Sequence, residues 1–274
     1  MPDETRKSRF TRRQTFGIVG TAGAGLLIAS GVRGLQSLDG ADGAAARSSN
    51  ATYRPACTLT PEQTEGPYYV DLGKIRRNIV AGRPGVPLTM RVRVVNSNTC
   101  KPIEGAAVDI WHCDAVGVYS SEASEGTAGQ TFLRGIQLTD EEGVAEFQTI
   151  FPGHYQGRTT HIHLKVHIGG QRNGKHYDGG HVSHTGQLFF SEAVSAQVFA
   201  LAPYNQSTSP VTTHAEDSIY IDQHGASSVL KLKRAGSSLQ RDGLRGRIVL
   251  GVNPKSTPDP VGVQGPGGGP PLIP

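Results

Sequence analysis

The segment FPGHYQGRTTHIHLKVHI, residues 151–168, begins with turn-forming residues and ends in an alternating pattern. From His161 to Ile168 polar and aliphatic side chains alternate, and this period of two predicts a β-strand. Residues two apart on a strand point to the same face, so His161 and His163 present both imidazoles on one side. Such a pair can hold a metal ion. Alone, however, it is more often a pair of surface or hydrogen-bonded histidines.

Similar short segments on both sides of this strand predict an all-β domain. The chain has 36 glycines and 17 prolines, which favour turns, and short strands with short connections indicate a β-sandwich or barrel with long loops. Residues 96–105 are rich in turn formers and predict a hairpin loop between the first two strands. A short helix is expected at residues 191–202, with Ser191 as its N-cap. The expected strands begin at Pro87, Gly105, Phe132, Gly143 and His161.

Two tyrosines change the interpretation of the histidine pair. Tyr119 ends the segment WHCDAVGVY, and Tyr155 lies in PGHY. Cysteine is absent near the pair, and the close carboxylates are Asp178 and Glu192, so a zinc site of the Cys/His kind is poorly supported. Phenolate is a hard anionic donor that suits ferric iron, and two phenolates with two imidazoles would neutralise most of its charge. An isolated tyrosine is usually a packing residue, so the inference depends on all four side chains together.

Tyr119, Tyr155, His161 and His163, with Arg158 before the first histidine, resemble the metal site of the intradiol ring-cleavage dioxygenases. The resemblance runs from about residue 60 to residue 168, and it is specific because its landmarks occur in order. It implies one non-haem Fe(III) per chain, held by the two tyrosines and the two histidines in a β-sandwich of this family's type. It also implies an enzyme that uses O2 to cleave the bond between the two hydroxylated carbons of a catechol, which gives a cis,cis-muconate-type product.

The resemblance also assigns roles to residues around the metal ligands. Arg158 would stabilise negative charge that develops on the ring, and Tyr155 would serve as ligand and general base in turn. Gln187, in the segment TGQLFF, matches a glutamine found near the substrate carbons. The segment TEGPYY resembles the part of the family that edges the substrate pocket, and its candidate pocket residues are Thr64, Gly66, Pro67 and Tyr68.

Two departures from the family pattern leave the substrate and the assembly open. The interval between Tyr155 and His161 is shorter than in the central-metabolic catechol and protocatechuate enzymes, so the identity of the catechol does not follow from the resemblance. The long helical N-terminal segment through which catechol enzymes dimerise is not expected, because only a short stretch separates the expected leader from TEGPYY. The oligomeric state is therefore open.

Two other classes of protein are compatible with part of the sequence. The segment CKPIEGAAVDIW, residues 100–111, also resembles the strands of surface accessory modules. A non-catalytic, exported β-sandwich that binds carbohydrate or another protein is therefore the main alternative. An exported copper or zinc protein could use the histidine pair, but it would leave both tyrosines unexplained. Neither class requires the four candidate ligands together.

The first 46 residues have the pattern of a twin-arginine export signal. Arg12 and Arg13 precede a glycine-diluted apolar run at residues 16–32, and small residues follow up to Ala46. The run falls short of the roughly 20 strongly apolar residues of a membrane span, which argues against a membrane anchor. We therefore expect export by the twin-arginine machinery to a secreted or cell-envelope location.

The rest of the chain is expected to form one catalytic domain at residues 47–253, followed by a disordered, Pro/Gly-rich tail at residues 254–274. Residues 1–46 contain six of the 27 basic and four of the 23 acidic residues, which leaves a net charge of +2 for the remainder. A charge this small predicts no nucleic-acid-binding surface. The expected partners are a small catechol and O2.

Three cysteines follow the expected leader, and an exported chain meets an oxidising compartment where one pair can bond. Cys100 lies in the expected hairpin loop and Cys57 in an extended segment, whereas Cys113 lies among apolar residues and is expected to be a buried free thiol. We favour a Cys57–Cys100 disulfide. Three reduced thiols are the alternative, because sequence does not fix connectivity.

Overall fold

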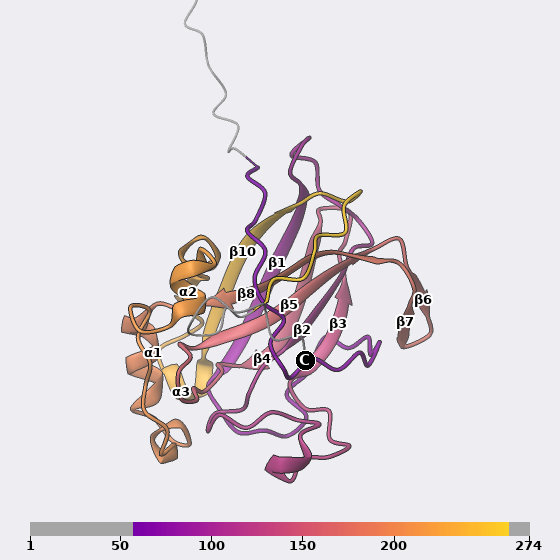
Figure 1. Ribbon diagram of the computed structural model, residues 1–274. Helices are drawn as coiled ribbons and strands as arrows, with labels where there is room; N and C mark the ends of the chain where they lie inside the picture. The colour runs from indigo at the N-terminus through magenta and orange to yellow at the C-terminus, as the bar shows by residue number, and fades with distance from the viewer. Residues whose placement is uncertain (1–56, 263–274) are drawn as a thin grey trace, which may run out of the picture. The chain divides into compact units, whose positions relative to one another are not determined.

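The structure is a computed structural model that describes residues 57–262 (Figure 1). The expected leader, residues 1–46, lies outside the described residues, and so does the expected tail from residue 263 onward. Strands make up most of the regular structure of the described chain, and helices are few and short. The expectation of an all-β fold is confirmed.

Eight of the strands form two four-stranded sheets, and Figure 1 shows them as two layers. One core contains buried side chains of both sheets, such as Val92 and Leu164, so the sheets pack face to face as a sandwich. The first sheet has the order β4 (Val144–Ile150), β1 (Pro87–Asn96), β10 (Leu244–Val252) and β9 (Lys231–Arg234). The second has the order β3 (Arg134–Leu138), β2 (Ala107–Trp111), β5 (His161–Ile168) and β8 (His181–Phe189).

Burial along β5 explains how the fold creates a polar interior. β1 alternates buried and exposed residues through Val94, as a strand with one solvated face does. In β5, by contrast, the six residues from His161 to Val166 are all buried. Ile162 and Leu164 belong to the hydrophobic core, whereas His161 and His163 point to the opposite face. The second sheet is therefore buried on both faces at β5. One face packs against the hydrophobic core, and the other carries the polar side chains.

The connection between β1 and β2 contains the hairpin loop expected at residues 96–105, with an antiparallel bridge between Val95 and Pro102, but it does not pair the two strands. These residues form a tight turn, in which the backbone N–H of Cys100 donates to the carbonyl of Asn96 at 2.8 Å. The strands before and after the turn nevertheless belong to different sheets. β1 is paired in parallel with β10 and antiparallel with β4, which occupies its other edge. The loop was therefore predicted correctly, but β1 and β2 cannot pair because β4 and β10 occupy both edges of β1.

In the described part of the chain, three short α-helices lie in the connections that follow β8 and β9. α1 (Glu192–Phe199) begins after Ser191 as expected, although the Ser191 side chain makes no capping hydrogen bond and the helix ends earlier than residue 202. The other two helices are α2 (Ser218–Asp222) and α3 (Leu239–Asp242). A separate two-stranded sheet consists of β6 (Gln171–Asn173) and β7 (His176–Asp178). No helix within residues 57–262 is both long enough and apolar enough to cross a membrane.

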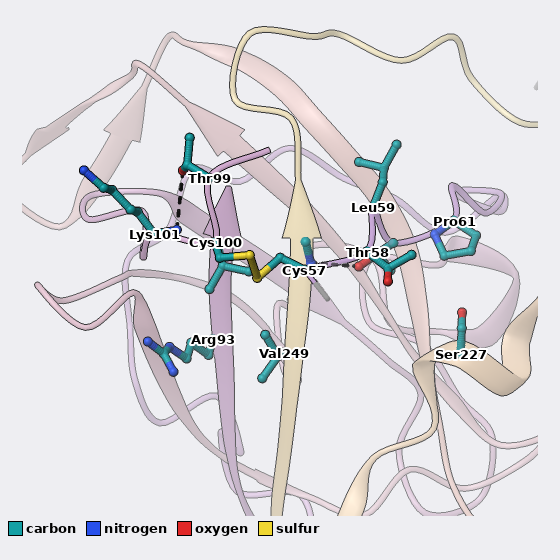
Figure 2. Close-up of a pocket in the computed structure, with 13 residues that line it drawn as sticks. Cys57, Thr58, Leu59, Pro61, Arg93, Thr99, Cys100, Lys101, Ser227 and Val249 are labelled. Atoms are coloured by element: carbon teal, nitrogen blue, oxygen red, sulfur yellow. Dashed lines mark hydrogen bonds between the residues drawn. A yellow bond between two sulfur atoms is a disulfide. The ribbon is translucent and has the colours of Figure 1, made fainter. Parts of the chain in front are cut away.

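A disulfide joins Cys57 to Cys100, with their Cα atoms 5.3 Å apart, and Cys113 is a buried free cysteine. Figure 2 shows the bond above Arg93 of β1 and Val249 of β10. The bond thereby fixes the N-terminal segment against the turn that follows β1. This is the pairing favoured from the sequence.

Loss of this disulfide should destabilise the protein substantially. The two cysteines are 43 residues apart in the sequence, and a cross-link of that span stabilises by about 3 to 4 kcal/mol through the entropy of the unfolded chain. Urea denaturation should therefore show that loss for Cys57→Ser, for Cys100→Ser and for the double variant alike, because each change breaks the same bond. Additive losses, or a Cys100–Cys113 peptide in non-reducing mapping, would contradict the assignment.

Candidate active site

The centre of the candidate site is the histidine pair of β5. β5 lies between β2 and β8, and its register places His163 between Trp111 on one side and Gln187 on the other. The Nε2 atoms of His161 and His163 are 3.0 Å apart. The indole of Trp111 stacks on the His163 ring with centroids 5.1 Å apart, which fixes the ring plane. Strand parity thus brings the two imidazoles together, as the sequence predicted.

Burial sets the protonation of both histidines, and a hydrogen bond sets the tautomer of His161. The Nδ1–H of His161 donates to the carbonyl of Thr159 at 2.6 Å, so the Nε2 atom of His161 carries the lone pair. Burial lowers the pKa of both His161 and His163 well below the usual value, and the nearby Arg158 guanidinium lowers these pKa values further. Both rings are therefore neutral at physiological pH and available as metal ligands.

Two glycines allow the loops that carry the tyrosines to approach one another. The loop between β2 and β3 contains Tyr119, and the loop between β4 and β5 contains Tyr155. A Cβ atom at Gly117 would lie 2.6 Å from the carbonyl oxygen of His154, and one at Gly153 would lie 2.5 Å from that of Asp114. Only glycine permits backbones to pack this closely. The motifs that resemble the family are therefore also those that bring the two tyrosines together.

The phenol groups of both tyrosines belong to the same buried cluster. The Tyr155 hydroxyl is 3.0 Å from Nε2 of His161. The ring of Tyr119 is 5.8 Å from that of Tyr155 and 6.2 Å from that of His163, and its buried hydroxyl has no hydrogen-bond partner among the described residues. Burial raises the pKa of both phenols, while Arg158 lowers that of Tyr155. A buried phenolate at either position would need a nearby cation.

These four side chains fit a ferric ion. Imidazole nitrogen and phenolate oxygen are donors that iron accepts, and two of each would neutralise most of a triple charge. The buried Tyr119 hydroxyl has no hydrogen-bond partner among the described residues, and such an unsatisfied polar group is costly unless an ion binds it. The residues that would hold the ion are Tyr119, Tyr155, His161 and His163.

Arg158 lies at the edge of this cluster and is held from two sides. Its Nε donates to both carboxylate oxygens of Asp217, at 3.0 and 3.2 Å, and its Nη2 donates to Oε1 of Gln187. Gln187 is fully buried, and its Nε2 donates to the carbonyl of Thr64 at 2.9 Å. The structure thus joins the expected arginine and glutamine directly. The guanidinium presents a fixed positive charge to the histidines and to Tyr155.

Residues 64–68, which precede the first strand, cover one side of the cluster. A Cβ atom at Gly66 would lie 3.0 Å from Cε1 of His163, so this glycine allows close contact with the histidine. The Tyr68 ring stacks on Tyr119 with centroids 4.2 Å apart. Pro67, by contrast, is exposed. The expected pocket residues Thr64, Gly66 and Tyr68 therefore contact site residues, whereas Pro67 lies at the surface.

Asp217 is the site residue that the sequence-based analysis missed. Its fully buried carboxylate accepts hydrogen bonds from Arg158, from the backbone N–H of Thr159 at 2.9 Å, and from the first turn of α2. Thr159 in turn fixes the tautomer of His161. The sequence offered one signal, since Asp217 precedes Ser218–Asp222 as an N-cap would. Its distance from the motif hid the contact with Arg158.

The sequence that contains the four candidate ligands matches a family of known proteins. A family model described as Dioxygenase matches residues 64–190. Catechol 1,2-dioxygenase 1 from Acinetobacter lwoffii is 32% identical over an alignment length of 112, and the match covers 38% of this chain and 36% of the relative. Catechol 1,2-dioxygenase from Candida albicans is 34% identical over an alignment length of 85, and the match covers 24% of this chain and 27% of that one. The matches thus span well under half the length of these curated relatives.

A solved structure gives a more extensive match. An intradiol ring-cleavage dioxygenase from Tetranychus urticae is 37% identical in sequence, with a TM-score of 0.64. The match covers 74% of this chain and 98% of that chain. It therefore extends over nearly the whole of the related chain.

The Arg158–Asp217 pair should be energetically coupled. Its side chains are 14% and 0% exposed, and removal of one partner of a buried pair typically costs about 3 to 5 kcal/mol. Arg158→Gln and Asp217→Asn should each lower the free energy of unfolding by about that amount. The double variant should cost less than the sum by about 0.5 to 3 kcal/mol, because neither charge is then left unpaired.

Urea denaturation of the four proteins measures this coupling. The exposed pair Arg77–Glu146, with side chains 56% and 30% exposed, provides the control cycle through Arg77→Gln and Glu146→Gln. Its coupling should stay below about 1 kcal/mol. Additive effects at Arg158 and Asp217 would show that the buried contact does not hold the arginine.

Proposed function

We propose that this chain, which belongs to the intradiol ring-cleavage dioxygenase family, uses O2 to cleave a catechol between its two hydroxylated carbons and yields a cis,cis-muconate-type product. The observation that carries the proposal is the convergence of Tyr119, Tyr155, His161 and His163 in one buried cluster. A non-catalytic β-sandwich has no need to bury two neutral imidazoles and two phenols together. The proposed cofactor is one non-haem Fe(III) per chain.

A bound ferric ion would draw electron density from a catecholate and so make the ring reactive toward O2, whose triplet ground state otherwise reacts slowly with singlet molecules. The side chains perform the remaining tasks. Tyr155 is the ligand joined to Arg158, since the two residues form a backbone bridge, and its hydroxyl contacts His161. We assign its Oη as the acceptor of a proton from the entering catechol.

Arg158 and Gln187 are assigned to the organic substrate. The guanidinium is a permanent cation held by Asp217, so it can stabilise negative charge on the ring without having to reorganise. Gln187 orients the guanidinium through its Oε1 and is itself oriented by Thr64. Gly66 and Tyr68 lie beside His163 and Tyr119, where they would border the ring of the substrate. The proposed partners are thus a small catechol and O2.

The two tyrosines should respond differently to removal of their hydroxyl groups. Tyrosinate-to-iron charge transfer would colour the iron-loaded protein deep red. Tyr119→Phe should lower the iron content and shift the visible band both before and after catechol is added, because Tyr119 is assigned as a permanent ligand. Tyr155→Phe should change the resting spectrum, match wild type once catechol is bound, and bind catechol more slowly because its proton acceptor is missing.

Anaerobic catechol titrations of the three proteins, with iron analysis and O2 uptake, test the assignment. Tyr177→Phe is a matched control, because this tyrosine is buried against Gly170 and outside the cluster. A Tyr155→Phe complex that differs from the wild-type complex as much as the resting forms do would reject the role of Tyr155. If neither site variant alters iron content or colour, the proposed iron site is wrong.

We further propose that the protein is exported by the twin-arginine machinery to the cell envelope or the medium. Arg12 and Arg13 before a weakly apolar run support the proposal. Replacement of both arginines by lysine keeps the charge and should retain the protein in the cytoplasm, as cell fractionation would show. Export of the Lys-Lys variant at the wild-type level would reject the twin-arginine assignment and leave the enzymatic proposal untouched.

A further inference from the structure

The outward face of the sheet β4-β1-β10-β9 concentrates positive charge. Side chains two apart on a strand, and register partners on neighbouring strands, point to the same side of a sheet. β1, β10 and β9 each contribute two exposed cations to this side. We call them the cationic face, and they are Arg91, Arg93, Arg245, Arg247, Lys231 and Lys233.

Negative charge on the same side is sparse. Glu146 is the one carboxylate among the outward residues of these four strands, and it pairs with Arg91 and Arg77. Within residues 57–262, none of the four cations on β9 and β10 has a carboxylate partner. Six cations and one carboxylate give the outward residues of these strands a net charge of +5, which exceeds the formal net charge of +4 of the whole chain. Charge is therefore segregated onto this face.

The arrangement is unfavourable for folding. Arg247 lies directly opposite Arg91 of β1 and Lys231 of β9, and Arg245 lies directly opposite Lys233. Neighbouring strands are about 4.8 Å apart, and like charges directly opposite one another destabilise a sheet. A bound polyanion would turn these repulsions into favourable contacts.

The cationic face is also hollowed. Two adjoining hollows, of about 750 and 510 Å³, share Arg93, Val249 and Ser227 as lining residues. Figure 2 shows Arg93 and Val249 beneath the disulfide, with Lys101 on the turn beside them. Aliphatic residues such as Val144 and Val249, which share this side of the sheet, line the second hollow between the cations. Together the hollows form a trough with apolar and cationic walls.

We infer that the cationic face binds an acidic polysaccharide, a linear chain of sugars that carry carboxylate groups. Four of the six cations are arginines, whose planar forks match carboxylates in a bidentate way. Rows of cations at the strand spacing suit a polymer with a charge on each sugar, and the aliphatic walls suit the apolar faces of sugar rings. The face includes no residue assigned to catalysis, so this inference is independent of the proposed reaction.

Other polyanions fit the face less well. Single-stranded nucleic acids are bound by cations together with aromatic rings on which bases stack, and the outward residues of these four strands include no aromatic ring. Anionic membranes are bound by cations together with a large apolar surface that inserts between lipids. Val249, at 58% exposed, is the large exposed apolar side chain on these strands, which is too little to insert.

Binding of fluorescently labelled polygalacturonate to the purified protein tests the inference. Wild type should bind in 50 mM NaCl, and the affinity should fall steeply as salt rises, because cations on the face replace counterions of the polymer. Arg245→Gln with Arg247→Gln should weaken binding at least tenfold and flatten the salt dependence. Arg172→Gln with Lys175→Gln removes the same charge from the exposed β6–β7 hairpin and should change the affinity less than twofold.

These outcomes distinguish binding at the cationic face from attraction by the net charge of the whole protein. Methyl-esterified polygalacturonate, which has the same backbone without the charge, should not bind. Equal losses in the two double variants would show that net charge alone attracts the polymer and would overturn the inference. Tighter binding of oligo-dT or of phosphatidylserine vesicles than of polygalacturonate would also overturn it. Catechol turnover should be the same in both double variants as in wild type.

Discussion

The buried carboxylate of Asp217 is the contact on which the geometry of the site depends. It holds the Arg158 guanidinium, the backbone N–H of Thr159 and the first turn of α2 at once. Thr159 then fixes the tautomer of His161 through its carbonyl. One buried carboxylate therefore orients both the guanidinium proposed to face the substrate and an imidazole proposed to bind the metal. Arg158 and the backbone N–H groups supply this fully buried carboxylate with hydrogen-bond donors that an isolated buried carboxylate would lack.

Close backbone packing is the second constraint. The tyrosines come from two loops that connect different pairs of strands, and each loop needs a glycine where it contacts the other. A side chain at Gly117 or Gly153 would push the loops apart and with them the phenols of Tyr119 and Tyr155. The sequence motifs around the two tyrosines therefore include residues with no chemistry of their own. Their role is to let the two phenol groups come close together.

The two faces of the sandwich have different properties. The sheet that contains β5 buries polar side chains on its outer side beneath residues 62–69, whereas the sheet that contains β1 leaves its outer side open and cationic. The small net charge of the sequence did not predict this cationic face, since a net charge averages over a whole surface. Strand parity and register decide which charges share a face. A nearly neutral domain can therefore carry a strongly basic face.

The sequence alone determined the elements whose signals are local. Alternation predicted β5 and the shared face of His161 and His163, and the ordered motifs predicted the partners Tyr119, Tyr155, Arg158 and Gln187, which the structure brings into one cluster. Only the tertiary structure decided the contacts between distant segments. It paired β1 with β10 instead of β2, and it placed Asp217 against Arg158. The physical reason is that periodicity and turn chemistry act over a few residues, whereas strand pairing and buried ion pairs are selected by the packing of the whole chain.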